Sequence, residues 1–173
     1  MEEVVLTVLD DIYPKTKIIH HRVSTRGIIL NERNQVAILK IQVEDMFGKR
    51  DHYELPGGGK EKDETIIETL KREMEEEVGV TIKDIVSLGI VEYEYNLLQR
   101  HEYSHYFMAR KDKDVKRRLT KMEEDILSDL LWIDIDELID KLKNEHVENV
   151  GILIHKRELF MLELVKKQLK KEV

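Results

Sequence analysis

The sequence predicts an α/β (α+β) fold. The order of its segments carries this prediction: β-rich segments come first, one amphipathic helix at residues 66–78 follows, and further strands and closing helices complete the chain. At 173 residues, without a linker, repeat or low-complexity segment, the chain is expected to form one domain spanning residues 1–173.

The first group of strands lies before three consecutive glycines. We expect strands at residues 4–9, 17–24, 26–30, 35–41 and 52–55. The polar residues 31–34 predict a hairpin turn, and residues 45–51, which carry Gly48, are expected to form a loop. The last strand ends at Leu55, because the residue before a proline is pushed out of helical space. The glycines at 57–59 then favour a loop where backbone approaches a ligand closely.

The helix after the glycines has start and stop signals. Asp63 or Thr65 is the expected N-cap, and Glu68 completes a capping box with Thr65. An apolar stripe at helical spacing comprises Ile66, Ile67, Leu70, Met74 and Val78. Gly79 is the expected C-terminal stop.

The second half of the chain predicts three strands and two helices. The strands are expected at residues 85–95, 105–110 and 130–133, with a charged loop at 112–125. A helix capped by Asp134 or Asp136 should run to Asn144. From His155 onward, an apolar stripe of Leu159, Leu162, Val165 and Leu169 predicts a helix that packs on the sheet or, alternatively, on a partner.

The carboxylates of the central helix are unusually placed. At about 100° per residue, Glu77 falls inside the apolar stripe, Glu73 lies at its edge and Glu76 lies a little further round. Like charges at this spacing repel, and a hard divalent cation relieves the repulsion because it prefers several oxygen ligands. The alternative is a solvated charged helix with pairs such as Glu68 with Arg72.

These residues form one spaced motif. It consists of Gly58, Glu64, Arg72-Glu73, Met74, Glu76-Glu77 and Gly79-Val80. The motif resembles the Nudix box, G-x5-E-x7-R-E-U-x-E-E-x-G-U with U aliphatic, at every specified position. The resemblance to the Nudix hydrolase (MutT-like) family covers about residues 24–145 and implies a Nudix fold, a mixed β-sheet sandwiched between α-helices. Residues 1–23, an N-terminal strand extension, and residues 146–173, a C-terminal helix, are less clearly matched.

The resemblance implies roles for the box. Mg²⁺ (or Mn²⁺) would be held against a diphosphate by Glu73, Glu76, Glu77 and the carbonyl of Gly57. Arg72 would orient a neighbouring glutamate, and water would attack phosphorus. The general base is left open. Glu64 is a possible extra base or ligand, as are Glu123 and Glu124 if they are more than a solvated loop.

The substrate is implied less sharply. Arg26 lies where the fold often lines its pocket, and Tyr53, Tyr93 or Tyr95 would stack on a base unless they are ordinary half-buried strand residues. Relatives that hydrolyse ADP-ribose carry a proline where this chain has Tyr95. We expect a nucleoside triphosphate, modified or not. The alternatives are an ADP-ribose or sugar-nucleotide pyrophosphatase, or a catalytically silent ligand-binding module.

The amino-acid composition excludes or disfavours several kinds of site, partner and location. The chain has no cysteine, which excludes Cys-ligated metal sites and the catalytic cysteine of Nudix-like prenyl diphosphate isomerases. A net charge of −7 with mixed signs disfavours nucleic acid as a partner. We expect no signal peptide, no membrane association and a cytoplasmic location. Residues 4–9 would be an exposed edge outside the matched region, which predicts a homodimer.

Overall fold

A computed structural model describes residues 2–172 of the chain. Its strands are β1 (Val4–Val8), β2 (His20–Leu30), β3 (Gln35–Asp45), β4 (Gly48–Glu54), β5 (Gly57–Gly59), β6 (Val80–Tyr95), β7 (Arg100–Asp114) and β8 (Leu127–Asp134). Its helical segments are α1 (Ile66–Glu73), the π-helical turn η1 (Met74–Val78), the 3₁₀ turn η2 (Asn96–Leu98), α2 (Lys121–Ile126), α3 (Ile135–Asn144) and α4 (Val150–Lys171).

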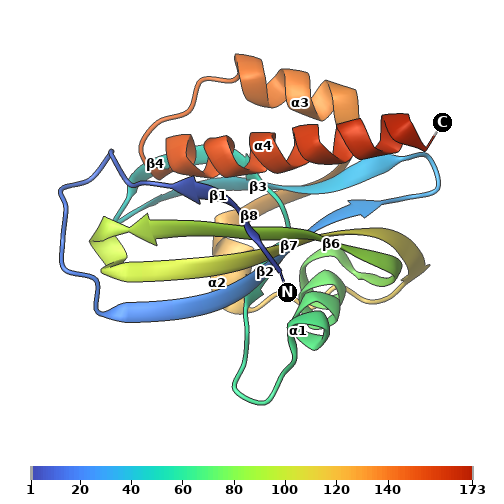
Figure 1. Ribbon diagram of the computed structural model, residues 1–173, viewed down its shortest axis with the longest axis horizontal. Coiled ribbons are helices and arrows are strands. Elements are labelled where there is room, and N and C mark those ends of the chain that lie inside the picture. Colours follow the sequence, from blue (N-terminus) through green and yellow to red (C-terminus); the bar gives the residue numbers. More distant parts are fainter. Residues whose placement is uncertain (1, 173) are drawn as a thin grey trace.

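The strands form one mixed sheet in the order β1-β6-β7-β2-β3-β4, with β5 paired to β2 and β8 paired to β3. The pairs β1–β6 and β2–β7 are parallel, whereas β2–β3, β3–β4, β3–β8, β2–β5 and β6–β7 are antiparallel. Two faces of this sheet carry separate apolar clusters, one that includes α3 and α4 and one that includes α1 and η1. Figure 1 shows α3 and α4 on one side of the sheet and α1 on the other. The predicted fold class, a mixed sheet between helices, is confirmed.

The sheet has a crossing point that matters for the site. β2 and β3 pair beside their turn, where Leu30 lies opposite Val36, and then part. β4 pairs along β3 as far as the pair of Glu54 with Leu39, and β5 pairs with β2 from Gly57 onward. The chain therefore crosses from one strand to the other at the dipeptide 55–56.

Local signals explain where the helices begin and end. Thr65 and Glu68 form the predicted capping box of α1, and Asp134 accepts a hydrogen bond from the backbone N–H of Asp136 at the start of α3. Gly79 ends the η1 turn with a left-handed φ of 75°. No helix in the described part of the chain combines the length and apolar composition that crossing a membrane requires.

Three segments expected to be loops are more regular. Residues 45–51 form the tight hairpin between β3 and β4, where Gly48 has a φ of 88°. Residues 57–59 pair with β2 as strand β5. Within residues 112–125, β7 continues to Asp114, and α2 begins after Thr120, which caps it together with Glu123. In each case the ordering comes from strand pairing or helix capping, which the charged residues of 45–51 and 112–125 and the glycines of 57–59 did not reveal.

Other boundaries differ by a few residues. The second strand begins at His20 rather than at residue 17, and the last helix begins at Val150, before His155. Ile67 was expected in the apolar stripe of α1, yet it is 36% exposed. The other four residues of the expected stripe do pack: Leu70, Met74 and Val78 are buried in the cluster on this face of the sheet, and Ile66 is partly buried against it.

Candidate active site

The glutamates of the motif sit where α1 becomes η1. The change to a π-helical turn at Met74 leaves Glu73 and Glu77 buried, while Glu76 is half-buried. The expectation that Glu77 points inward is confirmed by this burial. A π-helical turn inserts one extra residue per turn, and such turns are frequent at functional sites.

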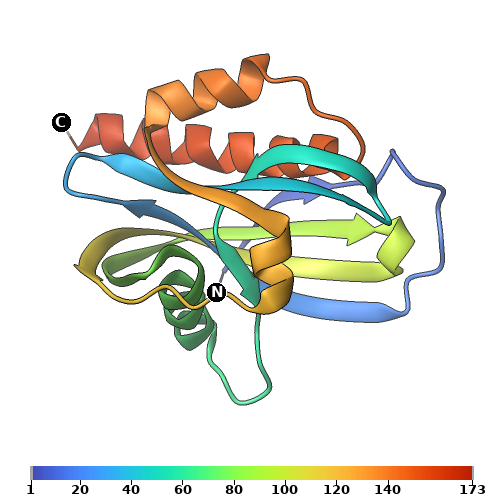
Figure 2. The ribbon, with the colours of Figure 1, turned by 180° about the vertical axis from the view of Figure 1, so that it is seen from behind.

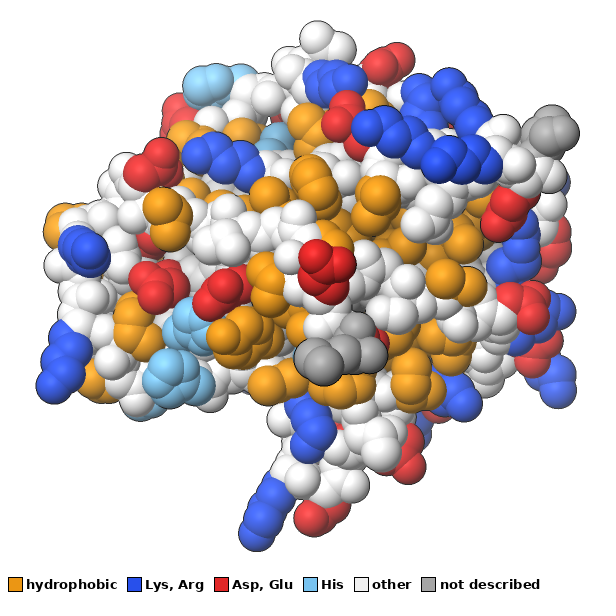
Figure 3. Space-filling model, viewed as in Figure 1, with side chains coloured by type: hydrophobic (Ala, Val, Ile, Leu, Met, Phe, Trp, Pro, Cys, Tyr) orange, Lys and Arg blue, Asp and Glu red, His pale blue; other side chains and the backbone are white. Residues whose placement is uncertain are grey.

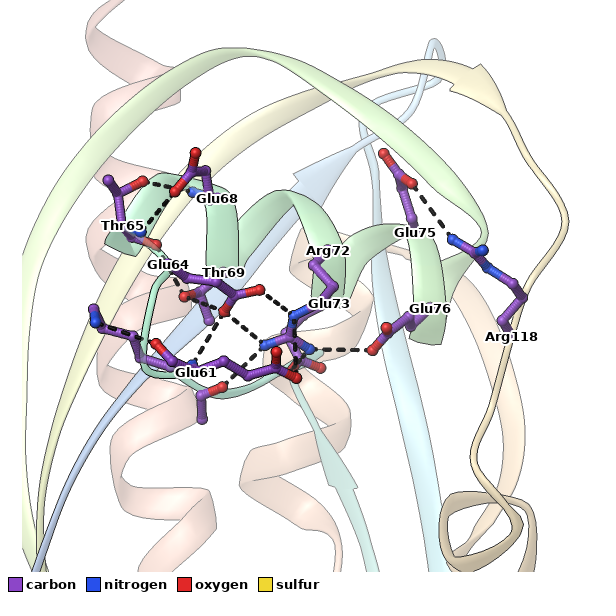
Figure 4. A network of polar contacts seen from close by, with 12 residues as sticks. Glu61, Glu64, Thr65, Glu68, Thr69, Arg72, Glu73, Glu75, Glu76 and Arg118 are labelled. Carbon is purple, nitrogen blue, oxygen red and sulfur yellow. Dashed lines mark hydrogen bonds and ion pairs between the residues drawn. The ribbon is translucent and has the colours of Figure 1, made fainter.

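Arg72 organises the carboxylates around it, as Figure 4 shows. One guanidinium nitrogen, Nη1, lies 2.8 Å from Glu73 and 3.2 Å from Glu76. The Nε and Nη2 atoms bind Glu64, and Nη2 also donates to the carbonyl of Gly59 at 3.0 Å. This geometry agrees with a positioning role for Arg72.

Glu64 and Glu68 each have a local partner. Glu64 accepts hydrogen bonds from the hydroxyl of Thr69 and the backbone N–H of Glu61. Arg72 holds the pKa of Glu64 at about 2. Glu68 accepts from the backbone N–H of Thr65 at 2.7 Å. The surface pair of Glu68 with Arg72, which a plain charged helix would form, is replaced by this cap.

The glycines allow the loop to close on the helix. The N–H of Gly57 donates to Glu77 Oε2 at 2.8 Å. A Cβ at Gly57 would lie 1.9 Å from the carbonyl oxygen of Thr25, and a Cβ at Gly58 would lie 2.3 Å from Glu73 Oε1. Both positions therefore require glycine for the loop and the carboxylates to lie this close.

The electrostatics of the pair Glu73 and Glu77 favour a cation. Burial, followed by the charge of Glu73, raises the pKa of Glu77 to about 8. Burial also raises the pKa of Glu73, although Arg72 opposes this. The donors are carboxylate oxygens and a backbone carbonyl, which are the ligands that hard divalent ions take.

The donors fit such a metal in kind but are not all free to hold it. In the described part of the chain, no three histidine or acidic side chains stand ready to hold a metal ion. Arg72 occupies oxygens of both Glu73 and Glu76. These two carboxylates would have to turn from Arg72 to join Glu77 around a cation.

A cavity of about 140 Å³ lies beside Glu77, in the region where β2 and β3 have parted. Arg26, Glu54, Gly57 and Glu123 are among its lining residues. Figure 2 shows α2, which supplies Glu123, on the same side of the molecule as β5. Glu124, by contrast, is exposed to solvent and does not line this cavity.

A second cavity of about 130 Å³ adjoins the first and shares Arg26, Arg50 and Glu54 with it. Charged residues line part of it, and another part of its wall is aromatic: the ring centroid of Tyr95 lies 5.1 Å from that of Tyr93 and 6.1 Å from that of Phe47. Arg26 lies between the cavities and binds Glu54 at 2.9 Å. Arg26 lines the cavity beside Glu77, whereas Tyr95 lines only the second cavity, and the contact of either residue with a substrate stays a prediction.

Tyr53 lies apart from both cavities. It alternates with Glu54 along β4, and the ammonium of Lys40 lies 4.3 Å from the centre of its ring. Its contact with a substrate stays a prediction that this placement does not favour.

Sequence reasoning missed two charged residues behind the cavities, Arg157 and Glu158 of α4. Both are fully buried. A signal existed, since they lie among Leu153, Ile154, Met161 and Leu162 on the apolar side of that helix. Charges within an apolar stripe also identified Glu77.

Comparisons with known proteins show the family and the fold of the chain. A model of the NUDIX domain family matches residues 20–153. Comparison with curated proteins gives no match.

Solved structures of similar fold are found. A NUDIX hydrolase from Nitrosomonas europaea has 18% identity and a TM-score of 0.60, over 80% of this chain and 87% of that chain. A MutT protein from Methanosarcina mazei Go1 has 18% identity and a TM-score of 0.61, over 90% and 99%. A MutT NUDIX hydrolase from Burkholderia pseudomallei has 21% identity and a TM-score of 0.55, over 68% and 86%. At these identities the similarity concerns the fold.

Proposed function

From the premise that this chain belongs to the NUDIX family, we propose that it is a pyrophosphohydrolase that cleaves a phosphoanhydride bond in a small nucleotide-type compound with Mg²⁺ or Mn²⁺. The observation that carries the proposal is the meeting of Glu73 and Glu77 with the glycine loop, next to a cavity that Arg26 lines.

The residues have distinct proposed roles. Glu73, Glu76, Glu77 and the carbonyl of Gly57 would hold the metal. When bound, the cation neutralises charge on the diphosphate and lowers the pKa of water. Arg72 positions the carboxylates. Arg26 lies between the two cavities, where its guanidinium can bind a phosphate oxygen as well as Glu54.

The candidates for an extra base differ in their placement. Glu64 has a pKa of about 2 because Arg72 binds it, so it is a poor proton acceptor. Glu124 is exposed and lies off the cavity. Glu123 lines the cavity and is therefore the better placed of the loop acids, although its carboxylate also caps α2 through the N–H of Thr120.

The proposed substrate is a nucleoside triphosphate, modified or not. The aromatic wall formed by Phe47, Tyr93 and Tyr95 suits a base or another flat group. An ADP-ribose or sugar-nucleotide substrate is the alternative, because the same wall would accept an adenine. A panel of nucleoside triphosphates, oxidised nucleotides, ADP-ribose, sugar nucleotides and dinucleoside polyphosphates, compared by kcat/KM, decides between them. A lead of more than about tenfold for ADP-ribose or a sugar nucleotide would end the triphosphate proposal.

Two substitutions test the metal ligands. Glu76→Gln and Glu77→Gln each remove one ligand charge, and we expect kcat to fall on the order of 10³-fold with Mg²⁺ or Mn²⁺. Both variants should fold: Glu76→Gln removes like-charge repulsion, and in Glu77→Gln the amide oxygen can still accept the N–H of Gly57. Glu75→Gln is the matched control on the same turn, since Glu75 contacts only Arg118, at 3.9 Å, among the ion pairs of the described residues.

The outcomes separate the candidate functions. Near-full activity of both variants on a good substrate of the wild type would show that the ligands are misassigned. Tight binding of a non-hydrolysable nucleotide, without turnover across the panel, would favour a silent ligand-binding module.

A further inference from the structure

Helix α4 places two buried charges, Arg157 and Glu158, next to residues that line the cavities: Arg157 binds Glu54 and Tyr95. Arg157 is 2% exposed and Glu158 is 0% exposed. Both lie beyond residues 20–153, the part of the chain that the family model matches. They nevertheless contact the segment that leads into the glycine loop: Glu54 at the end of β4, and Leu55 after it.

Arg157 uses three sides of its guanidinium. Its Nη2 binds Glu54 at 3.0 Å, and its Nη1 donates to the hydroxyl of Tyr95 at 2.6 Å. Its Nε donates to Glu158 at 2.9 Å. Arg157 and Arg26 thus both bind one oxygen of Glu54, Oε1, and their charges outweigh burial to keep the pKa of Glu54 at about 2.

Glu158 binds the backbone where the chain crosses between strands. Its Oε2 accepts the N–H of Leu55 at 3.0 Å, and its Oε1 accepts the hydroxyl of Tyr106 at 2.7 Å. Neither β4 nor β5 includes Leu55, so Glu158 supplies the partner that a neighbouring strand would otherwise give. The carbonyl of Leu55 accepts from Arg26 at 2.9 Å.

The crossing is therefore fixed at both backbone polar groups of one residue, Leu55, which lies two residues before Gly57. Gly57 in turn donates its N–H to Glu77. A buried ionic network of this kind is a poor means of adding stability, because apolar residues of similar size often serve as well. The hydrogen bonds of the network have fixed directions, and this property suits it to holding a loop in one position.

We propose that Arg157 and Glu158 are positioning residues: they hold the Glu54 side chain and the backbone N–H of Leu55, and through these they place the Gly57 loop and Arg26 for metal and diphosphate. This inference rests on the proposed function. It assigns to α4 a part in the site that the family motif does not contain.

Arg157→Lys is the first test, because lysine keeps the charge and loses the three-sided contact. We expect kcat to fall about 10- to 100-fold and the Kd for Mn²⁺, measured by calorimetry without substrate, to rise about tenfold. Arg157→Met should be worse in both measurements, so that lysine gives partial rescue. Tyr106→Phe removes only one hydrogen bond to Glu158 and should give a smaller loss of the same kind.

The matched control is Leu162→Ala in the same helix. Leu162 is fully buried in the apolar cluster and contacts none of the charged groups through a hydrogen bond or ion pair. It should lower the urea midpoint at least as much as Arg157→Lys, yet leave kcat and the Mn²⁺ Kd within about twofold at a temperature where both variants are folded.

Two results would overturn the inference. One is an equal loss of kcat in Leu162→Ala and Arg157→Lys, and the other is an unchanged Mn²⁺ Kd in Arg157→Lys and Tyr106→Phe. If the wild type turns over no diphosphate at all, the proposed function fails, and the Mn²⁺ titrations still judge the positioning role. If Arg157→Lys does not fold, Tyr106→Phe decides.

Discussion

Glu77 combines burial with a neighbouring like charge, Glu73, and this pair gives it a pKa of about 8. At pH 7 the metal-free protein therefore holds a proton there, and a metal that takes Glu77 as a ligand must displace it. We expect binding of Mn²⁺ or Mg²⁺ to release about one proton at pH 7. Calorimetry in two buffers with different ionisation enthalpies measures this number.

The control variants sharpen this measurement. Glu75→Gln should release the same proton, and Glu77→Gln should release almost none. Metal binding by the wild type with no dependence on the buffer would show that Glu77 is not the displaced group.

His52 makes a second pH-dependent contribution. Burial lowers its pKa from 6.5 to about 4, and its Nε2 has no hydrogen-bond partner. The unfolded chain takes up a proton below pH 6.5 whereas the folded chain does not, so stability falls as pH drops from 6.5 towards 4. Between pH 7 and pH 4.5, His52 should lower the free energy of unfolding by about 2–3 kcal/mol.

Urea unfolding at pH 7 and pH 4.5 tests this contribution. His52→Leu should lose about 2 kcal/mol less than the wild type between the two pH values. His146→Gln, which changes an exposed histidine, is the control. Equal losses in the wild type and His52→Leu would refute the assignment.

The sequence predicted that Glu77 is buried in the site, but it did not predict the contacts of Arg157, and the difference has a physical reason. Glu77 could be found because its burial follows from helical periodicity, a local property. Helical periodicity also places Arg157 among apolar residues, which marks it as unusual. Periodicity does not reveal which residues Arg157 binds, because its partner Glu54 lies 103 positions earlier in the chain. Pairings over such distances depend on the sheet order, which local patterns do not specify.

At the scale of single elements, the η1 turn depends on its terminal glycine. Gly79 has a φ of 75°, and a Cβ there would lie 3.0 Å from the carbonyl oxygen of Val115. We expect Gly79→Ala to destabilise the protein by about 1–3 kcal/mol. Gly79→Asn should cost less, because asparagine tolerates the left-handed region. Urea unfolding measures both, and a greater loss for asparagine would contradict this explanation.

The sequence predicted the ends of some helices and strands but not of others. The ends of α1 and α3 followed from Thr65, Gly79 and Asp134, whose capping chemistry is local. The short helix α2 carried the same signal in Thr120 and Glu123, hidden within a charged run. Strand β5 carried none: three glycines have no strand propensity, and the pairing with β2 alone makes them a strand.

At the scale of the whole molecule, β1 is the edge of the sheet. It pairs with β6 on one side, so the predicted edge is covered there and open on the other. Leu9 is 71% exposed and Phe160 of α4 is 38% exposed, and both line a groove of about 420 Å³. Figure 3 shows hydrophobic side chains gathered on this face between α4 and the sheet.

We therefore expect a homodimer that uses β1 and the groove beside it. Sedimentation at micromolar concentration should give a dimer for the full chain and a monomer for Leu9→Lys with Phe160→Lys. Met122→Lys, at a residue of α2 that is 69% exposed, is the control and should leave the dimer intact. A monomer both for the full chain and for a chain that starts at Thr16 would end this idea.

The origin of Arg157 and Glu158 in α4 has a consequence for the timing of biosynthesis. A ribosome makes the whole box about 80 residues before it makes these two. Until α4 packs against the sheet, Glu54 binds one guanidinium group instead of two, and the N–H of Leu55 lacks its acceptor, the carboxylate of Glu158. If these two residues position the loop as proposed, a nascent or C-terminally clipped chain carries every residue of the motif but lacks the contacts that set the loop, and we expect its activity to be lower than that of the full chain.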